Sequence, residues 1–201
     1  DYRFSGGDRG VTADLSAGTA TDTFGQTDTL TNIERLRGSA FDDELTGDSG
    51  ANRLRGEEGN DILTGKGGAD DLRGGDGQDV FLWNDSSEGA VAASDDTPTN
   101  LSLDVDTISD FLTNIDRLVM VGAGFDGFSA GDSFDTGTNF FIIGSEYDGT
   151  NAGAADATAR IVVDSQGNVI ADGNGATGAG YTVVANVGAG TSVGTEDVQV
   201  I

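Results

Sequence analysis

Apolar residues recur at intervals of nine in the N-terminal half of the chain, and turn-forming residues fill the space between them. Leu45, Leu54, Leu63, Leu72 and Phe81 follow this spacing without a gap. In a strand of three residues the middle side chain points to one face and its two neighbours to the other. The pattern predicts one short strand and one turn in every nine residues, with two such units forming one coil of a flat spiral. We expect parallel strands eighteen residues apart to stack over a thin apolar core.

Five consecutive nonapeptides from Gly38 to Leu82 carry the same residue types at four positions. Position one is always glycine, position four is glycine in all but the first unit, position six is Asp or Asn, and position eight is Leu or Phe. Glycine reaches the positive-φ conformations of tight turns, which residues with a Cβ resist, so the first six residues predict a turn. The position-one glycines are Gly38, Gly47, Gly56, Gly65 and Gly74, and the position-six residues are Asp43, Asn52, Asp61, Asp70 and Asp79.

The chain is strongly acidic, with 35 acidic and 10 basic residues and a formal net charge of −25. Such a surface repels nucleic acid and anionic lipid and attracts cations, so we expect no nucleic-acid partner. No apolar run approaches the ~20 residues of a membrane-spanning helix, and we expect no membrane span. The chain contains neither histidine nor cysteine. Because this removes the usual zinc ligands, the usual general base and the Ser-His-Asp and Cys-His catalytic sets, we expect no enzyme.

The position-six side chains predict a metal site. In the predicted spiral their carboxylates stack close together in successive coils, where like charges repel. A divalent cation between them would cancel this repulsion. A donor set of oxygen atoms alone favours a hard ion, and carboxylates combined with the backbone carbonyls of a flexible turn suit calcium better than magnesium. We therefore predict several calcium ions in the turns.

The nonapeptides resemble the glycine-rich repeats of RTX (repeats-in-toxin) proteins. The resemblance implies an all-β fold, a parallel β-roll in which calcium ions lie between turns two units apart. Each turn would then contribute its position-six side chain and backbone carbonyls, with the position-one glycines among the candidates. The implied pairs are Asp43 with Asp61, Asn52 with Asp70, and Asp61 with Asp79. Neutral Asn52 departs from the pattern, so we expect its site to bind calcium more weakly.

Three regions are expected along the chain. Residues 1–37 are predicted to form degenerate lead-in coils of the roll, residues 38–82 the nonapeptide roll, and residues 83–201 a β-rich cap. In the lead-in, Glu34 falls at position six, where it either faces Asn52 across another ion or is a solvated side chain. In the cap, short strands are predicted at Asp104–Phe111, Asn114–Val121, Asn139–Ile143, Ile161–Val163, Val169–Ile170 and Tyr181–Val187.

The order of these regions resembles the C-terminal portion of serralysin-type and other type I-secreted RTX proteins. That resemblance implies an uncleaved export signal in the last residues, and the acidic-then-apolar ending predicts that Ile201 is the natural end. It also makes Asp106 and Asp110, just after the roll, candidates to complete the last calcium turn. The alternative is that these two residues lie at a solvated strand edge.

Basic residues are expected to gather on one face, because residues eighteen apart share a sheet. Guanidinium groups bind carboxylates in a forked geometry, so such a face could hold an anionic polysaccharide, as the roll modules of alginate epimerases are thought to do. The alternative is that the arginines only screen neighbouring acidic residues. Half of the basic residues of the chain belong to this group: Arg35, Arg37, Arg53, Arg55 and Arg73.

The sequence thus predicts a calcium-binding module that folds on binding calcium. The resemblance to RTX proteins implies that it does so outside a Gram-negative bacterium, secreted into the medium or held at the cell surface. Its partners would be calcium and, during export, the type I secretion machinery. It would serve as an export signal and a stabilising scaffold for an upstream domain. Two alternatives remain open: a module that binds anionic polysaccharide or the cell surface through its arginines, and a self-assembling component of a surface layer or biofilm.

Overall fold

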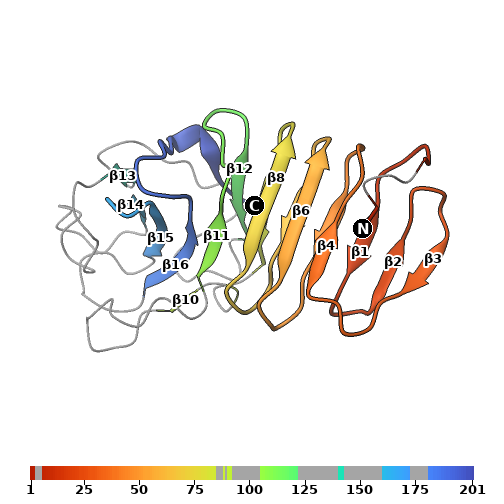
Figure 1. Ribbon diagram of the computed structural model, residues 1–201. Helices are drawn as coiled ribbons and strands as arrows, with labels where there is room; N and C mark the ends of the chain where they lie inside the picture. Colours follow the sequence, from red (N-terminus) through yellow and green to blue (C-terminus); the bar gives the residue numbers. More distant parts are fainter. Residues whose placement is uncertain are drawn as a thin grey trace.

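The computed structural model of the chain describes residues 1–2, 6–84, 88, 90–91, 105–121, 140–142, 160–172 and 181–201. In these residues the regular structure is almost entirely strands, and the strands form two sheets that enclose a common core (Figure 1). The all-β fold expected from the sequence is therefore confirmed. No helix in the described part of the chain has the length and apolarity to cross a membrane.

The nonapeptides form a two-sided parallel roll. Its strands are, in the first sheet, β5 (Glu44–Thr46), β7 (Ile62–Thr64) and β9 (Val80–Trp83), and in the second sheet, β4 (Arg35–Arg37), β6 (Arg53–Glu58) and β8 (Asp71–Asp76). Each strand pairs in parallel with the strand eighteen residues further along, so that Leu45 opposes Leu63 and Leu54 opposes Leu72. The spacing predicted from the period of nine is confirmed.

Two strands of the second sheet are longer than the three residues expected. In β6 and β8 the pairing continues past the position-one glycine, with Glu57 opposite Gly75 and Glu58 opposite Asp76. Glu57 and Gly75 both have positive φ, at 93° and 116°. Because both residues bend the backbone in the same way, the neighbouring chains stay aligned and keep pairing into the turn.

The lead-in joins the roll in two ways. β4 pairs in parallel with β6, as a coil would. β1 (Thr12–Asp14) pairs in parallel with β5, but β2 (Thr19–Thr21) and β3 (Thr27–Thr29) continue the first sheet as antiparallel strands. The connections between these three strands are short, and a short connection can only join antiparallel neighbours. Only part of residues 1–37 therefore has the geometry of a roll coil.

Both sheets continue from the roll into the cap. In the second sheet β11 (Asp106–Ile108) pairs with β8, and in the first sheet β12 (Arg117–Met120) pairs with β9. The first sheet ends with β17 (Val198–Val200), which follows a 3-10 turn at Thr195–Asp197. The roll therefore has no free sheet edge toward the cap.

The rest of the cap extends the second sheet. β16 (Tyr181–Asn186) pairs with β11 and with β10 (Ala90–Val91). β14 (Arg160–Val163) and β15 (Asn168–Asp172) form an antiparallel hairpin, and β13 (Phe140–Ile142) pairs with β14. The strands predicted in the cap are confirmed, with β11 and β12 shorter than expected and β14 and β15 longer.

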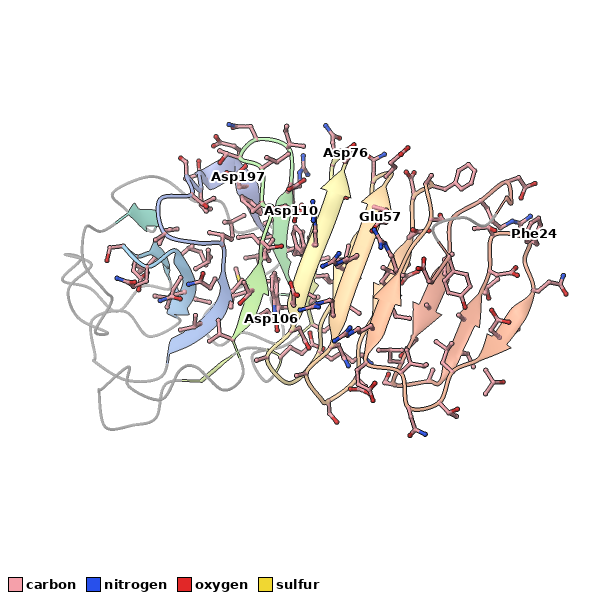
Figure 2. All side chains as sticks on the ribbon, viewed as in Figure 1. Phe24, Glu57, Asp76, Asp106, Asp110 and Asp197 are labelled. Atoms are coloured by element: carbon pink, nitrogen blue, oxygen red, sulfur yellow. The ribbon has the colours of Figure 1, made fainter. Side chains whose placement is uncertain are left out.

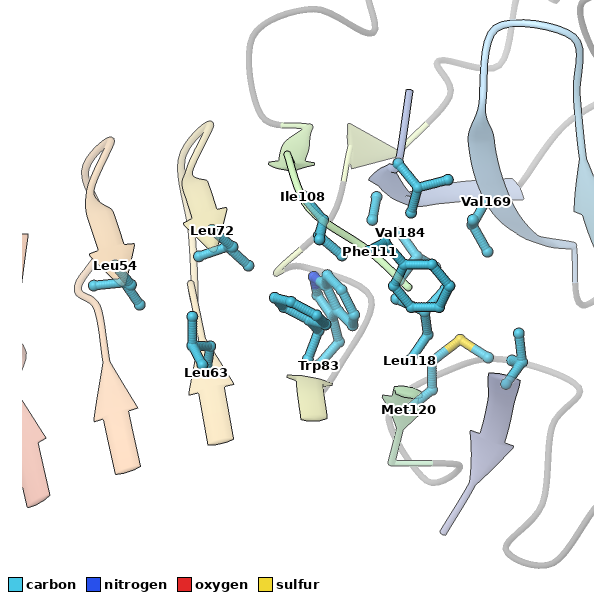
Figure 3. Packing of buried hydrophobic residues seen from close by; sticks show 14 of the residues in the cluster. Leu54, Leu63, Leu72, Trp83, Ile108, Phe111, Leu118, Met120, Val169 and Val184 are labelled. Carbon is cyan, nitrogen blue, oxygen red and sulfur yellow. The ribbon is translucent and has the colours of Figure 1, made fainter. Parts of the chain in front are cut away.

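One apolar core runs through the roll and the cap. In the roll it is a single row of side chains, and the leucines at position eight are fully buried. At the junction with the cap the core widens around Trp83, Phe111, Leu118 and Met120 (Figure 3). The rings of Phe81 and Phe111 lie 6.4 Å apart there. The roll itself buries little apolar surface, so other interactions must stabilise its turns.

Candidate metal sites in the turns

Acidic side chains of the first sheet's turns form a ladder of hydrogen bonds between coils, which we call the first ladder. The backbone N–H of Asp43 donates to Oδ1 of Asp61 at 2.8 Å, that of Asp61 to Asp79 at 3.0 Å, and that of Asp79 to Asp116 at 3.1 Å. All four side chains are buried. Asp43, Asp61 and Asp79 are thus brought together as predicted, and Asp116 extends their row into the cap.

The turns of the second sheet carry a second ladder. The backbone N–H of Asn52 donates to Oδ1 of Asp70 at 2.7 Å, and that of Asp70 to Oδ1 of Asp106 at 3.1 Å. The structure therefore brings Asn52 and Asp70 together, and it places Asp106 at the end of their row. That these residues bind calcium stays a prediction, as does the weaker site at Asn52.

The inner members of the ladders have an unsatisfied oxygen. Oδ2 of Asp61, Asp70 and Asp79 is buried and has no hydrogen-bond partner. Within the described residues only one other buried side-chain polar atom, Oγ1 of Thr23, lacks a partner. Burying an acceptor without a donor costs about 1–3 kcal/mol, and more for a charged group. The missing partners are therefore concentrated in the turns of the roll.

The end members differ, because protein donors reach their outer oxygens. Ser39 N–H donates to Oδ2 of Asp43 at 2.6 Å, and Asp48 N–H donates to Oδ1 of Asn52 at 2.7 Å. At the other ends, Leu112 N–H donates to Oδ2 of Asp116 at 2.8 Å, and the Trp83 indole donates to Oδ2 of Asp106 at 3.0 Å. In each ladder the outer oxygens of the two end members thus accept hydrogen bonds, whereas those of the inner members do not.

The position-one glycines leave room for these oxygens. A Cβ added at Gly38, Gly47 or Gly56 would lie 1.9–2.4 Å from the position-six oxygen of its own unit, and 2.3–2.6 Å from the carbonyl oxygen of the glycine eighteen residues on. None of the position-one glycines has a positive φ, so the expected turn conformation is not the reason for glycine here. Glycine is required because a side-chain oxygen and a carbonyl oxygen occupy the space of its Cβ.

Burial raises the pKa of the ladder carboxylates. The pKa of Asp61 is raised to about 8, that of Asp70 to about 7, that of Asp79 to about 6 and that of Asp106 to about 9. Loss of water is the main cause in each case, and hydrogen bonds from backbone N–H groups oppose it. The burial of Asp43 and Asp116 raises their pKa as well. The folded turns therefore favour either protons or cations on these groups.

The donors present fit a calcium ion. No group of three or more acidic side chains within the described residues surrounds a single point, so a metal here must combine carboxylate with backbone carbonyl oxygens. The carbonyl oxygen of Gly74 is such a group next to the unsatisfied oxygen of Asp61, because both lie within 2.6 Å of the position of a Cβ added at Gly56. An all-oxygen set of carboxylate and carbonyl groups in a turn is what calcium prefers in proteins. When bound, the ion would neutralise the buried carboxylates and join one coil to the next.

Of the two acidic residues predicted just after the roll, only Asp106 is in a ladder. Both lie at the junction of the roll and the cap (Figure 2). Asp110 instead pairs with Arg73 at 3.1 Å and accepts the N–H of Gly74 at 3.2 Å. Glu34, for which two roles were open, is exposed. A role for Asp110 as a calcium ligand stays a prediction.

Sequence reasoning missed Asp116, although a signal was present. The segment Thr113 to Leu118 reads TNIDRL, and the lead-in segment Thr31 to Leu36 reads TNIERL. Asn32 and Asn114, the equivalent residues of these segments, both have positive φ, at 54° and 61°. Because Glu34 falls at position six of its unit, the same alignment assigns Asp116 to position six of a further, interrupted unit.

The five arginines lie on the second sheet as expected, but three of them form ion pairs. Arg37 pairs with Glu57, Arg53 with Asp71 and Arg73 with Asp110. A cavity of about 330 Å³ is lined by Asp1, Arg35, Leu36, Arg37, Arg53 and Arg55. The pairing supports the screening role for three arginines and leaves Arg35 and Arg55 as the more available cations of this face.

Comparison with known proteins supports the assignment of the turns. The family model of the RTX calcium-binding nonapeptide repeat, with four copies, matches residues 28–63 and 46–81. No match was found among curated proteins. Among solved structures, the chain is similar to the AlgE6R3 subunit of the mannuronan C5-epimerase of Azotobacter vinelandii, with 27% identity over 65% of this chain and 73% of that chain and a TM-score of 0.33. RTX repeats are non-catalytic calcium-binding units. Residues 28–81 are therefore similar to the RTX calcium-binding nonapeptide repeat, and their strands form a parallel roll.

Proposed function

We propose that the chain is a calcium-dependent folding module that is exported unfolded and folds outside a Gram-negative cell. In this role it acts as an export signal for the type I secretion machinery and as a stabilising scaffold for an upstream domain. The observation that carries the proposal is the unsatisfied, buried Oδ2 of Asp61, Asp70 and Asp79. A fold that buries these oxygens is poorly stable without a cation and well suited to one.

Calcium binding must add the free energy of folding that the thin apolar core does not provide. Each site that binds calcium only in the folded state contributes about 2.7 kcal/mol when calcium exceeds Kd a hundredfold. Several sites together contribute an amount comparable to the usual margin of stability of a small domain, which is about 5–15 kcal/mol. Extracellular calcium modules bind with Kd of about 10⁻⁴–10⁻³ M. With such an affinity the chain stays unfolded during export and folds in the medium.

Circular dichroism of the whole chain tests the proposal. In EDTA we expect a spectrum of a largely unfolded chain, and in millimolar calcium a β spectrum. Magnesium at the same concentration should substitute poorly, because it demands tighter octahedral geometry and gives up its water reluctantly. A full β spectrum in EDTA would contradict the proposal.

A second candidate function is binding of an anionic polysaccharide through Arg35 and Arg55. It is favoured by the cavity that four arginines line, and by the exposure of Arg35. If it is correct, the calcium-loaded chain is retained on an alginate column at low salt and released by added salt. Retention should be lost in the double variant Arg35→Ser/Arg55→Ser.

The control for this experiment must remove the same charge elsewhere. Arg9 is exposed in the lead-in and Arg117 is exposed on the first sheet, so Arg9→Ser/Arg117→Ser has the same net charge as the test variant. Free calcium is held constant, because alginate chelates it. Equal retention of the two double variants would show that only overall charge matters, and this candidate would fall.

A further inference from the structure

Trp83 and Asp106 connect the two sheets at the place where the roll meets the cap. Trp83 is the only tryptophan of the chain, ends β9 and is fully buried. Its indole Nε1–H donates to Oδ2 of Asp106 at 3.0 Å, and Asp106 begins β11 in the opposite sheet. β11 pairs with β8 of the roll on one side and with β16 of the cap on the other. This hydrogen bond therefore holds the strand that joins the cap to the roll.

Asp106 faces an unsatisfied carboxylate of the roll. Oδ2 of Asp70 is buried without a partner, and Asp70 is only 2% exposed. A Cβ added to Gly65 would lie 2.2 Å from this oxygen and 3.0 Å from Oδ2 of Asp106. Two acceptor oxygens thus surround one buried point. Charges of the same sign repel strongly there, because no water screens them, and a cation would turn the repulsion into attraction.

We propose that one calcium ion shared by Asp70 and Asp106 locks the cap onto the roll, and that Trp83 is the positioning residue that holds Asp106 for this ion. The proposal rests on the calcium-dependent folding proposed above. A carboxylate oxygen can accept more than one contact, so the indole N–H fixes the orientation of Asp106 while Oδ2 still faces the ion.

The ion would act on the attachment of β11. This strand is joined to the roll by backbone hydrogen bonds from Thr107 N–H to the Asp70 carbonyl at 2.7 Å and from Ser109 N–H to the Leu72 carbonyl at 3.2 Å. Both bonds follow directly after the pair of carboxylates along the strands. Without a cation, repulsion between Asp70 and Asp106 opposes these bonds. With a cation the carboxylates and the backbone hold the strand together.

Within the described residues, the end of the first ladder has no such hydrogen bond between the sheets. The outer oxygen of Asp116 accepts the N–H of Leu112, which lies only four residues earlier in the same segment. The Trp83 contact instead joins residues 23 positions apart in opposite sheets. The attachment of the cap that depends on Trp83 is therefore assigned to the second ladder.

Terbium, a hard ion that can replace calcium, gives a local test, since its luminescence is sensitised by a nearby indole. The whole chain is loaded with terbium and excited at the red edge of tryptophan absorption, where tyrosine contributes little. We expect sensitised emission in the wild type and in Asp8→Asn, which changes an exposed carboxylate outside both ladders. Emission should be lost in Asp106→Asn. Emission that persists in Asp106→Asn overturns the shared site.

The positioning role of Trp83 is tested with Trp83→Phe, which keeps an aromatic ring and removes the N–H donor. Calorimetric calcium titration should show one ion weakened by roughly tenfold or more, the effect expected for a hydrogen bond to a charged group. The other ions should be unchanged. Met120→Leu is the matched control, because Met120 lies opposite Trp83 on β12 and is buried in the same core without donating a hydrogen bond. If Met120→Leu weakens the same ion as much, Trp83 has only a packing role and the inference is wrong.

Circular dichroism and terbium emission distinguish a wrong assignment of the shared site from a wrong assignment of calcium-dependent folding. If calcium induces no folding by circular dichroism, the function itself is wrong. If calcium folds the chain but the wild type shows no sensitised terbium emission, only the shared site is wrong. NMR adds an independent measurement, because the single indole N–H resonance should be shifted and protected from exchange in calcium. An indole N–H that exchanges freely in the folded, calcium-loaded chain contradicts the proposal.

Discussion

At the scale of single residues, the glycines of the roll have two different tasks. Those at position one make room for oxygens, as described for Gly38, Gly47 and Gly56. Several at position four allow the backbone to turn: Gly59, Gly68 and Gly77 have φ between 97° and 149°. Gly50 occupies position four as well, but it has no positive φ. Glycine is therefore present for different physical reasons at different positions of the repeat, and at position four also in different units.

Gly59→Ala and Gly50→Ala form a matched pair that tests this distinction. At Gly59, where φ is 117°, an added Cβ would lie 2.6 Å from the backbone of Phe41, so both strain and collision oppose alanine. At Gly50 the nearest atom would be 3.4 Å away. We expect Gly59→Ala to lower the free energy of unfolding in calcium by about 1–3 kcal/mol, and Gly50→Ala to change it little. Urea denaturation in saturating calcium measures both, and equal losses would refute the assignment.

The position of an acidic residue within its ladder should decide its effect on calcium binding. Asp61 and Asp79 are inner members with unsatisfied oxygens, whereas Ser39 satisfies Asp43. Asp116 gives Asp79 a second neighbour, so Asp61 and Asp79 each take part in two successive pairs. Asp61→Ala and Asp79→Ala should therefore raise the calcium midpoint of folding similarly, and more than Asp43→Ala does. The extra loss corresponds to one site, about 2.7 kcal/mol at hundredfold excess of calcium over Kd.

Calcium titrations followed by circular dichroism compare the three variants. Asp43→Ala serves as the internal control, because it removes a carboxylate of the same ladder. Identical midpoints for all three would mean that the ions are not shared along the ladder.

At the scale of an element, each ladder should respond to pH in the absence of metal. The pKa of Asp61 is raised to about 8 by burial, against about 3.9 in an unfolded chain. A carboxyl whose pKa is higher in the folded state binds its proton more tightly there. Protonation therefore stabilises the fold most below the unfolded pKa, and this stabilisation is lost as pH rises from about 4 to about 8.

The metal-free chain should accordingly gain β structure when the pH falls from 8 to 5. In the presence of calcium the direction reverses, because protons and calcium compete for the same oxygens, so the calcium midpoint should rise as the pH falls. Circular dichroism in metal-free buffer measures the first effect. Asp61→Asn should weaken this pH response, because it removes one of the titrating groups. A metal-free chain that loses structure on acidification would contradict this account of the ladders.

At the scale of the whole molecule, the roll and the cap share their sheets, their core and their ladders. β11 and β12 continue the two sheets, and Asp106 and Asp116 end the two ladders. Phe81 and Trp83 are fully buried at this junction. The cap therefore does more than cover an apolar end, because it also completes the polar network of the last turns.

A fragment that ends at Asn84 should require more calcium to fold than the whole chain. It lacks the ladder ends in the cap, Asp106 and Asp116, and it exposes two aromatic side chains, each of which contributes about 1.5–3 kcal/mol when buried. Calcium titration of the fragment and the whole chain under the same conditions tests this. Equal midpoints would show that the roll folds independently of the cap.

The sequence by itself determined the repeating part of this protein. The period of nine, the row of leucines and the pairs of position-six side chains are local and recur in every unit, so turn chemistry and strand alternation suffice to predict them. Only the tertiary structure shows which residues end the two ladders and which donors satisfy them. Asp116, the donors on the outer oxygens and the Trp83–Asp106 bond depend on contacts between distant segments, and no local pattern encodes their distance or burial. Only the tertiary structure also shows that the position-one glycines are needed for space and not for a positive φ. The oxygens that fill the place of their Cβ come partly from neighbouring coils, and they are there only once the coils have stacked.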